Sequence, residues 1–308
     1  MNGDDDMSKR NLLLCFDAFG TLIKPARPVV QQYAEIARQC GVTDFDDHEL
    51  QSSLLAAIKK EAKKNPNYGK ATGLGATKWW TNVIHNTFTP LLRNNKPLPE
   101  ELAPALLHRF ATKDGYDTEP NLVSALKDLR RKKSQLHFDR VVIGVVTNSD
   151  DRVPSILSSL GLEVSPLRYG TEVDPKEVKE QEYDIDFHCM SYDVGVEKPD
   201  KLIFNAAELM LAEIIAMRNG KSPAEARADT ESWRKVHVGD EHAKDVVGAA
   251  NAGWKSVLLD GEEEAATIPR LEDHPNHTLE GLYKENDVVK VDSLRNLIAW
   301  LTNDAPIK

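Results

Sequence analysis

Polar residues that could do chemistry follow four apolar runs of the sequence. Asp17 follows "LLLCF", while Thr147 and Asn148 follow "VVIGVV". Lys198 lies in "VGVEKPDKLIF", a short way after a third run, and Asp240 follows "VHVG". The carboxyl ends of parallel strands meet at one edge of a sheet, where ligands bind. We therefore expect these side chains to converge on one cleft.

This set of side chains is suited to phosphoryl transfer. The Asp17 carboxylate can act as a nucleophile and form a covalent acyl intermediate that water later opens. Asp17 and Asp240 together offer the hard oxygen ligands that Mg²⁺ takes from proteins. The metal and Lys198 would hold the negative charge of a phosphoryl group, and Thr147 or Asn148 would donate hydrogen bonds to it. A lone aspartate at a strand end is usually a turn former or a helix cap; the common placement of the whole set favours a site.

The elements that must position these residues form an alternating pattern. Apolar runs predict strands at residues 11–16, 141–146, 187–190, 235–238 and 255–259, with a weaker one at 287–291. Helical patterns separate most of the runs, as in a parallel sheet. Apolar residues repeat at helical spacing over 122–129 and 153–160, and another helix is expected to begin near Pro199. The pattern predicts an α/β fold.

Residues 26 to about 115 break this alternation. Amphipathic patterns predict helices over 29–40 and 50–58, and two more in "KWWTNVIHNTF" and "PEELAPALLHRF". No convincing strand occurs among them, so the segment is expected to be an all-helical module inserted after the first strand. Trp79 and Trp80 are expected to anchor the core or the contact between domains.

Two further segments, 162–186 and 260–286, contain prolines and many acidic residues. Both predict loops that are long for a compact domain.

Bulk composition limits the classes of function. The net charge of −10 argues against a broad surface for nucleic acid or anionic membranes. An odd number of cysteines, Cys15, Cys40 and Cys189, fits reduced packing residues of an intracellular protein. No apolar stretch approaches the ~20 residues that span a bilayer, and the acidic N-terminus lacks the apolar core of a signal peptide. The expected location is the cytosol or the nucleus.

Four segments resemble the motifs of the haloacid dehalogenase (HAD) superfamily: "FDAFGTL", "VVTNSDD", "VGVEKPDKLIF" and "HVGDEHAKDVVGAANAGW". The segment "GATKWWTNVIHNTF" is also similar to the third HAD-like hydrolase-domain-containing group of eukaryotes. The resemblance implies a Rossmann-like parallel sheet core at 11–25 and 116–302, with an inserted all-helical cap at 26–115. Residues 1–10 would form a flexible N-terminus. The resemblance also implies an active site between the core and the cap, and Mg²⁺-dependent hydrolysis of phosphate esters.

The resemblance assigns roles to individual residues of this sequence. Asp17 matches the nucleophile, Thr147 the phosphate-binding residue of the second motif, and Lys198 the lysine of the third. Asp240 matches the metal-binding acid. Asp245 matches the outer acid that positions the metal's water or the lysine.

Phe19 departs from the family pattern, because HAD phosphatases usually carry a second acid at this position. That acid protonates the leaving group and then activates water, and a phenylalanine side chain can do neither. The backbone carbonyl of Phe19 could still bind Mg²⁺. General acid–base catalysis is typically worth about 10²–10⁴-fold in rate. A phosphatase with this motif is therefore expected to be slow, or to be specialised for substrates with good leaving groups, such as acyl or aryl phosphates.

Three functions follow from this departure, in order of preference. The first is a Mg²⁺ phosphatase that acts on a small phosphorylated molecule through an aspartyl phosphate. The second is a non-catalytic relative that binds a phosphorylated ligand or a protein partner. The third is a 2-haloacid dehalogenase, because halide leaves without a proton and those enzymes carry an aromatic residue at this position. Against the third, the pattern Gly-Asp-x-x-x-x-Asp resembles the metal-binding form, and dehalogenases need no metal.

Four histidines, His85, His108, His237 and His242, lack the spacing of metal ligands. They are expected to be packing or surface residues, with His242 lining the entrance of the site.

Overall fold

A parallel six-stranded sheet forms the centre of the molecule, in the order β5-β4-β1-β6-β7-β8. The computed structural model describes residues 10–93, 96–132, 138–259, 267–275, 277 and 279–302. The predicted flexible N-terminus lies outside the described residues, apart from residue 10. The strands of the sheet are β1 (Arg10–Phe16), β4 (Phe138–Thr147), β5 (Phe187–Met190), β6 (Arg234–Gly239), β7 (Lys255–Leu259) and β8 (Val288–Val291). All six predicted strands are present, and the predicted α/β class with a Rossmann-like parallel sheet is confirmed.

The alternation along β1 explains why its sequence is continuously apolar. Leu12, Leu14 and Phe16 belong to one hydrophobic cluster, and Leu13 and Cys15 belong to another on the opposite face. Because both faces of a central parallel strand are buried, every position requires an apolar side chain.

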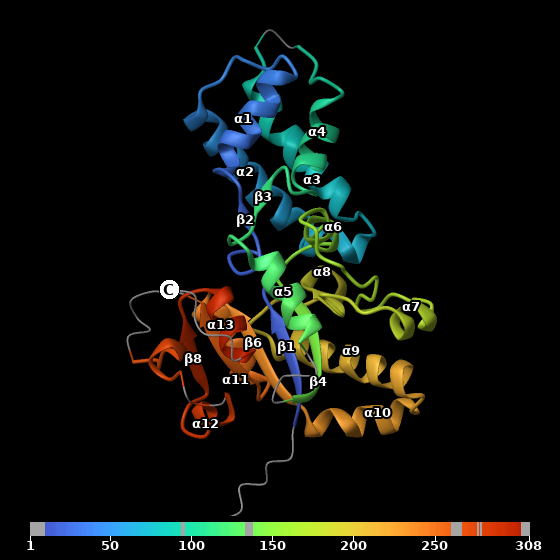
Figure 1. Cartoon of the computed structure of the whole chain (residues 1–308). Coiled ribbons are helices and arrows are strands. Elements are labelled where there is room, and N and C mark those ends of the chain that lie inside the picture. Colours follow the sequence, from blue (N-terminus) through green and yellow to red (C-terminus); the bar gives the residue numbers. More distant parts are fainter. Residues whose placement is uncertain are drawn as a thin grey trace, which may run out of the picture.

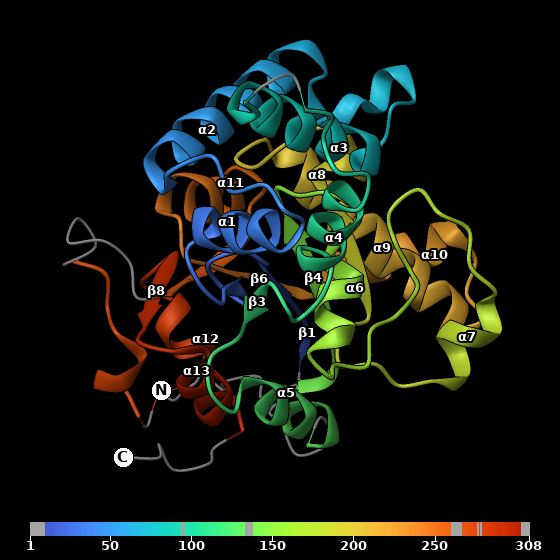
Figure 2. The same cartoon turned by 90° about the horizontal axis from the view of Figure 1, so that it is seen from above.

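Helices cover both faces of the sheet (Figure 2). One face packs against α5 (Leu122–Arg131), α6 (Val153–Ser159) and α13 (Leu294–Leu301). The other face packs against α9 (Lys201–Asn219) and α11 (Val247–Asn251). A further helix, α10 (Pro223–Asp229), packs on α9.

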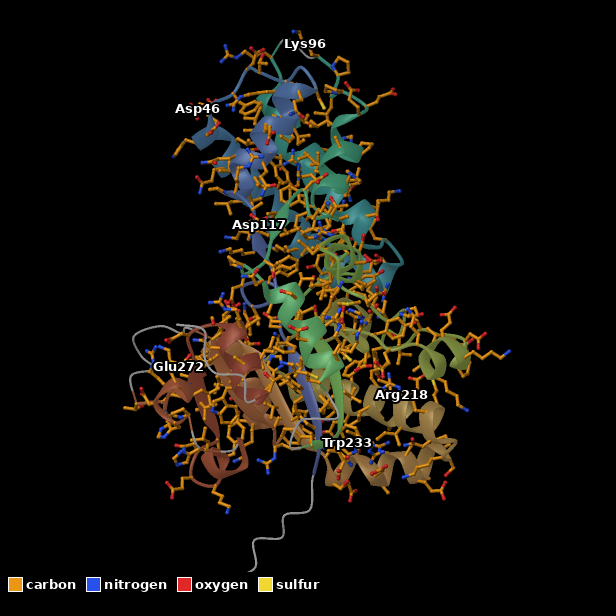
Figure 3. All side chains as sticks on the ribbon, viewed as in Figure 1. Asp46, Lys96, Asp117, Arg218, Trp233 and Glu272 are labelled. Atoms are coloured by element: carbon orange, nitrogen blue, oxygen red, sulfur yellow. The ribbon has the colours of Figure 1, made fainter. Side chains whose placement is uncertain are left out.

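Four helices form a segment at one end of the sheet (Figure 1). They are α1 (Val29–Gln39), α2 (Asp47–Lys64), α3 (Ala76–Phe88) and α4 (Leu102–Arg109). The described residues between 26 and 115 contain no strand. A short antiparallel ribbon, β2 (Lys24–Pro25) with β3 (Tyr116–Asp117), joins the segment to the sheet. Asp117 marks this junction in Figure 3, while Asp46 and Lys96 lie toward the far end of the segment.

Local sequence determines where two of these helices begin or end. The Asp46 side chain accepts a hydrogen bond from the Glu49 backbone N–H at 2.8 Å, and the Glu49 side chain accepts one from the Asp46 N–H at 3.1 Å. This capping box starts α2. Gly41, with a φ of +81°, follows the end of α1, where a left-handed backbone favours glycine.

The two predicted long loops are more ordered than expected. Segment 162–186 contains α7 (Pro175–Glu180) and buries Leu167 and Ile185. Asp184 accepts a hydrogen bond from the Glu163 N–H at 2.7 Å. The loop prediction is therefore wrong in part. Asp174 caps a short helix that begins at Pro175, and the prolines and acidic residues of the segment had indicated a loop instead.

In segment 260–286, residues 260–266, 276 and 278 lie outside the described residues. The remainder includes a 3₁₀ turn at Leu271–Asp273 and α12 (Leu279–Tyr283). The Tyr283 hydroxyl donates to the Ser256 carbonyl at 2.9 Å, which ties α12 to β7.

Other short elements complete the described chain: η1 (Asn67–Thr72), η2 (Thr89–Leu91), α8 (Ser191–Val194), η4 (Thr230–Ser232) and the π-turn η5 (His242–Val246). Among the described helices, none has the length and apolarity needed to cross a membrane.

His188 in β5 predicts a pH dependence of stability. Its ring is fully buried, and burial, with a smaller contribution from the Arg168 charge, lowers its pKa to about 3. Below the ordinary histidine pKa the unfolded chain therefore takes up a proton that the folded chain does not. For each pH unit below the ordinary histidine pKa and above the lowered one, this residue should reduce the free energy of unfolding by about 1.4 kcal/mol. Urea unfolding of wild type and His188→Phe, above and below the ordinary histidine pKa, measures the difference. Equal dependence of the two stabilities on pH would contradict the prediction.

Candidate active site

Three neighbouring strands end at the candidate site. Asp17 follows β1, Thr147 is the last residue of β4, and Asp240 follows β6. Because β1 lies between β4 and β6, their carboxyl ends are adjacent. The Asp17 N–H also donates to the Val238 carbonyl at 2.8 Å, which continues the β1–β6 pairing one residue past the strand and orients Asp17.

An acidic cluster lies at these strand ends. Carboxylate oxygens of Asp17, Asp240 and Asp245 are all within 4.8 Å of one another. Burial, together with the charges of Asp17 and Asp245, raises the pKa of Asp240, although a hydrogen bond from Thr21 Oγ1 at 3.0 Å acts in the opposite direction. A cation would relieve this repulsion, and a set of carboxylate oxygens suits a hard divalent ion. The cluster could therefore hold a metal ion.

Lys198 lies between two of the three acids. Its Nζ is 2.8 Å from Asp17 Oδ1 and 2.6 Å from Asp245 Oδ1, and the residue is only 4% exposed. Burial alone would lower the pKa of this ammonium, but the two carboxylates outweigh burial and the net pKa is raised. Lys198 therefore carries its charge directly beside Asp17.

Asp245 already has several donors. Its Oδ1 faces Lys198 Nζ and lies 2.9 Å from His237 Nε2, and its Oδ2 accepts from the Glu241 N–H at 3.0 Å. Burial would raise the pKa of this carboxyl, but the contacts with His237 and Lys198 lower it. Asp245 is thus placed to orient Lys198, while Asp17 and Asp240 remain for a metal ion.

The Asn148 side chain binds the backbone of Lys198 at both ends. Asn148 Oδ1 accepts from the Lys198 N–H at 2.6 Å, and Asn148 Nδ2 donates to the Lys198 carbonyl at 3.0 Å. These bonds hold the Asn148 amide against Lys198, so this side chain positions the lysine, and they use one of the two Nδ2 hydrogens. The second N–H of Asn148 and the hydroxyl of Thr147, which is 1% exposed at the end of β4, stay the predicted donors to a phosphoryl group.

Two glycines make room for the carboxylates. A Cβ added to Gly20, which has a φ of +89°, would lie 2.2 Å from Asp240 Oδ2. A Cβ added to Gly239 would lie 2.1 Å from Asp245 Cγ. Both distances are impossible for real atoms, so a side chain at either position would displace an acid of the site.

Gly239→Ala should therefore lower the free energy of unfolding by about 1–3 kcal/mol, the usual cost of overpacking. The added methyl would push the Asp245 carboxylate away from Lys198. Urea denaturation measures the change. A variant as stable as wild type would show that Asp245 moves aside without cost.

Phe19 directs its side chain into packing. Its ring lies 5.5 Å from that of Tyr116, which lies 5.9 Å from Phe110, which in turn lies 5.2 Å from Tyr33 in the helical segment. The hydrogen bonds of the Phe19 turn use the carbonyls of Ala18 and Ile23. None of them occupies the Phe19 carbonyl, which was predicted as a metal ligand.

A contact missed by sequence reasoning connects the helical segment to the strand end of β4. Trp80 Nε1 donates to Asp150 Oδ2 at 2.8 Å. The Arg152 guanidinium donates to both oxygens of Asp150 and stacks 4.6 Å from the centre of the Trp80 ring. Trp80 thus anchors the helical segment to the sheet, as expected. The charged pair Asp150 and Arg152, which comes soon after Thr147 and Asn148 in the sequence, was the signal that could have predicted this contact.

The described histidines of the fourth motif differ in position. His242 is exposed, whereas His237 is fully buried in β6 and contacts Asp245. The prediction of a packing role for His237 missed this contact.

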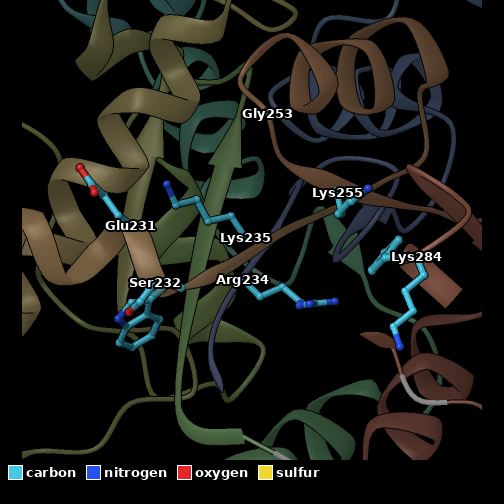
Figure 4. A pocket seen from close by; sticks show the side chains of 9 residues that line it. Glu231, Ser232, Arg234, Lys235, Gly253, Lys255 and Lys284 are labelled. Carbon is cyan, nitrogen blue, oxygen red and sulfur yellow. The ribbon is translucent and has the colours of Figure 1, made fainter. Parts of the chain in front are cut away.

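Two cavities differ in their relation to the site. One, of about 450 Å³, borders Thr21 and Asp240 beside the linkers of the helical segment. The other, of about 360 Å³, lies at the opposite edge of the sheet, where Arg234, Lys235 and Lys255 surround it (Figure 4). Glu208 pairs with Lys235 and Asp287 with Lys255. The charges of these two lysines are therefore compensated.

Comparison with known proteins identifies the family. The model for haloacid dehalogenase-like hydrolases matches residues 12–253. A hydrolase of Schizosaccharomyces pombe is 31% identical over 248 residues, which are 80% of this chain and 90% of the relative. Haloacid dehalogenase-like hydrolase domain-containing protein 3 of Mus musculus is 28% identical over 270 residues, covering 88% of this chain and 90% of the relative.

Solved structures share the fold. The 2-haloacid dehalogenase from Pseudomonas syringae aligns with a TM-score of 0.50 at 17% identity, covering 96% of this chain and 99% of that one. At this identity the similarity shows the fold alone. The family match and the relatives confirm the resemblance carried by the four motifs. The chain belongs to the haloacid dehalogenase-like hydrolase family.

Proposed function

We propose that this hydrolase is a Mg²⁺-dependent phosphatase that acts on small phosphorylated molecules through an aspartyl phosphate at Asp17. The observation that carries the proposal is the arrangement of charges around Asp17. Lys198 lies 2.8 Å away on one side, and the Asp240 carboxylate lies within the same acidic cluster. Three carboxylates and one ammonium leave the site with a net negative charge, so an anionic phosphoryl group would be repelled unless a further cation joins Lys198.

Each residue has a defined part in the proposed reaction. An Asp17 oxygen forms a bond to phosphorus while the bond from phosphorus to the leaving oxygen breaks. Lys198 neutralises the phosphoryl charge, and the Thr147 hydroxyl donates to a phosphoryl oxygen. Asp17, Asp240 and the Phe19 carbonyl would hold Mg²⁺, which supplies further charge neutralisation when bound. Water then attacks phosphorus, the bond from phosphorus to the Asp17 oxygen breaks, and the Asp17 carboxylate is restored. The proton lost by the water leaves on the released phosphate.

Phe19 restricts the substrates that this chemistry can use. No carboxyl at position 19 can protonate a leaving oxygen, so substrates whose leaving group is already a weak base should be favoured. Acyl and aryl phosphates meet this requirement. The cavity of about 450 Å³ beside Asp240 is of a size for a small molecule.

Two other functions are consistent with Phe19. A 2-haloacid dehalogenase would use Asp17 to attack carbon and expel halide, which also needs no proton donor. The cluster of Asp17 with Asp240 favours metal-dependent chemistry over this alternative. A protein that only binds a phosphorylated ligand would keep the metal and the lysine but release no product.

A panel of substrates separates the three functions. Purified protein is assayed with and without Mg²⁺ against an aryl phosphate, an acyl phosphate and 2-chloropropionate. The proposal expects Mg²⁺-dependent release of phosphate and no release of halide. Metal-independent halide release would identify a dehalogenase, and Mg²⁺ binding without any turnover would identify a binding protein.

Restoring an acid at position 19 tests the explanation for slow turnover. Phe19→Asp should speed hydrolysis of an alkyl phosphate by up to about 10²-fold, the lower range of general acid catalysis. It should also lower stability by about 0.5–1.5 kcal/mol, because the ring pair with Tyr116 is lost. Phe19→Leu removes the ring without adding an acid and is the matched control. Equal alkyl phosphatase activity in the two variants would refute the explanation.

A further inference from the structure

We infer that His237 is a positioning residue of this site, which holds the Asp245 carboxylate against Lys198 and thereby places the lysine ammonium on Asp17. Its kinetic test rests on the proposed phosphatase function, and a spectroscopic test does not.

His237 lies where an apolar side chain would be expected. It is in the interior of β6 between Val236 and Val238, and its exposed fraction is 0%. Its ring meets that of Phe204 edge to face, with centres 5.1 Å apart. A polar ring in this setting needs a partner, because an unpaired buried polar group costs stability.

The partner of the ring is the acid that holds Lys198. His237 Nε2 lies 2.9 Å from Asp245 Oδ1, the same oxygen that lies 2.6 Å from Lys198 Nζ. An ionised carboxylate only accepts hydrogen bonds, so His237 Nε2 must carry the proton. Burial, with a smaller contribution from the Lys198 charge, lowers the pKa of His237, although the hydrogen bond to Asp245 acts in the opposite direction. The contact with Asp245 and the lowered pKa together favour the neutral Nε2–H tautomer.

The other ring nitrogen shows that packing alone does not account for this histidine. His237 Nδ1 is buried and has no hydrogen-bond partner among the described residues. A phenylalanine would fill similar space beside Phe204 without that cost. What histidine supplies here and phenylalanine cannot is a hydrogen-bond donor, Nε2–H, to Asp245.

The shared oxygen explains how the contact acts on Asp17. With two donors on Oδ1 and the Glu241 N–H on Oδ2, the Asp245 carboxylate is held in one orientation. Without His237, one of the three donors that fix the Asp245 carboxylate would be lost, the carboxylate could rotate, and Lys198 would lose its fixed place between Asp245 and Asp17. The loss should therefore appear in the chemical step.

Two variants test this role kinetically. His237→Phe keeps the ring shape and removes the donor, whereas the Nε2 amide of His237→Gln can still reach Asp245. With an aryl phosphate and Mg²⁺, His237→Phe should lower kcat by about 10–100-fold, as loss of a supporting hydrogen bond does at metal sites, with little change in KM. His237→Gln should recover most of kcat. A purely structural role would instead make both variants alike.

The matched control is His188→Phe. His188 is also a fully buried strand histidine, but it lies in β5 and not beside Asp245. Its replacement should leave kcat unchanged. If His237→Phe also retained the wild-type kcat while wild type released phosphate, the inference would be wrong and the proposed function would stand.

A measurement independent of turnover uses the ring itself. Nitrogen-15 NMR of the histidine side chains should show His237 as the Nε2–H tautomer, and the Nε2 signal should shift in Asp245→Asn. The Nδ1–H tautomer in wild type would overturn the inference whatever the activity. If wild type releases no phosphate, the proposed function fails, and the tautomer still decides whether His237 holds Asp245.

Discussion

Replacing Asp17 by asparagine should reduce phosphate release by more than about 10³-fold, as loss of a nucleophile does in other hydrolases. An amide oxygen is a poor nucleophile, and the neutral side chain also attracts Lys198 and a divalent cation less strongly. The fold should survive, because Lys198 keeps its contact with Asp245 and repulsion within the acidic cluster falls. Steady-state kinetics and urea unfolding of the same preparation measure the two effects separately.

A surface aspartate provides the matched control for this substitution. Asp128→Asn removes an exposed carboxylate paired with Arg131 on α5, and it should leave both kcat and stability near wild type. If Asp17→Asn hydrolysed the substrate as fast as this control, Asp17 would not be the nucleophile.

Lys198→Met should have the largest combined effect on activity and stability. It removes the one cation within 3 Å of both Asp17 and Asp245 among the described residues. Breaking a buried ion pair in this way costs about 3–5 kcal/mol. Turnover should fall by about 10²–10³-fold, because a preorganised charge at the transferring group is lost.

The pH dependence of this loss identifies its cause. Without the ammonium, the buried carboxylate of Asp245 would be harder to ionise, so its pKa in the folded chain would rise from the lowered value of wild type. The folded variant would then bind protons more readily than folded wild type, and its stability deficit relative to wild type would shrink as pH falls. Lys201→Met, at an exposed position of α9, is the control. A deficit that did not shrink at acidic pH would argue for a packing defect instead.

Much of the fold follows directly from the sequence. Apolar runs such as Leu12–Phe16 are continuous because β1 is buried on both faces, and this made the strands and their parallel arrangement predictable. Parallel topology then brings Asp17, Thr147 and Asp240 together at adjacent strand ends. Lys198 lies in a loop after β5. Its place a short way after an apolar run predicted that it joins the same cleft, and the resemblance then matched it to the lysine of the third motif.

The residues that sequence reasoning missed depend on tertiary contacts. Alternation along β6 places the His237 side chain inside, but its partner Asp245 lies in a π-turn whose geometry no periodic pattern predicts. Asp150 accepts a hydrogen bond from Trp80, which is 70 residues away in the sequence. Asn148 was predicted to donate to a phosphoryl group, and only the structure places both ends of its amide on Lys198.

Detection of a phosphoryl group on Asp17 tests the central claim most directly. The enzyme is mixed with Mg²⁺ and an acyl phosphate, quenched during turnover, and reduced with borohydride, which converts an aspartyl phosphate to homoserine. Peptide mass spectrometry should then find homoserine at position 17 in wild type and none when Mg²⁺ is omitted. An unmodified Asp17 in an enzyme that is releasing phosphate would contradict the account.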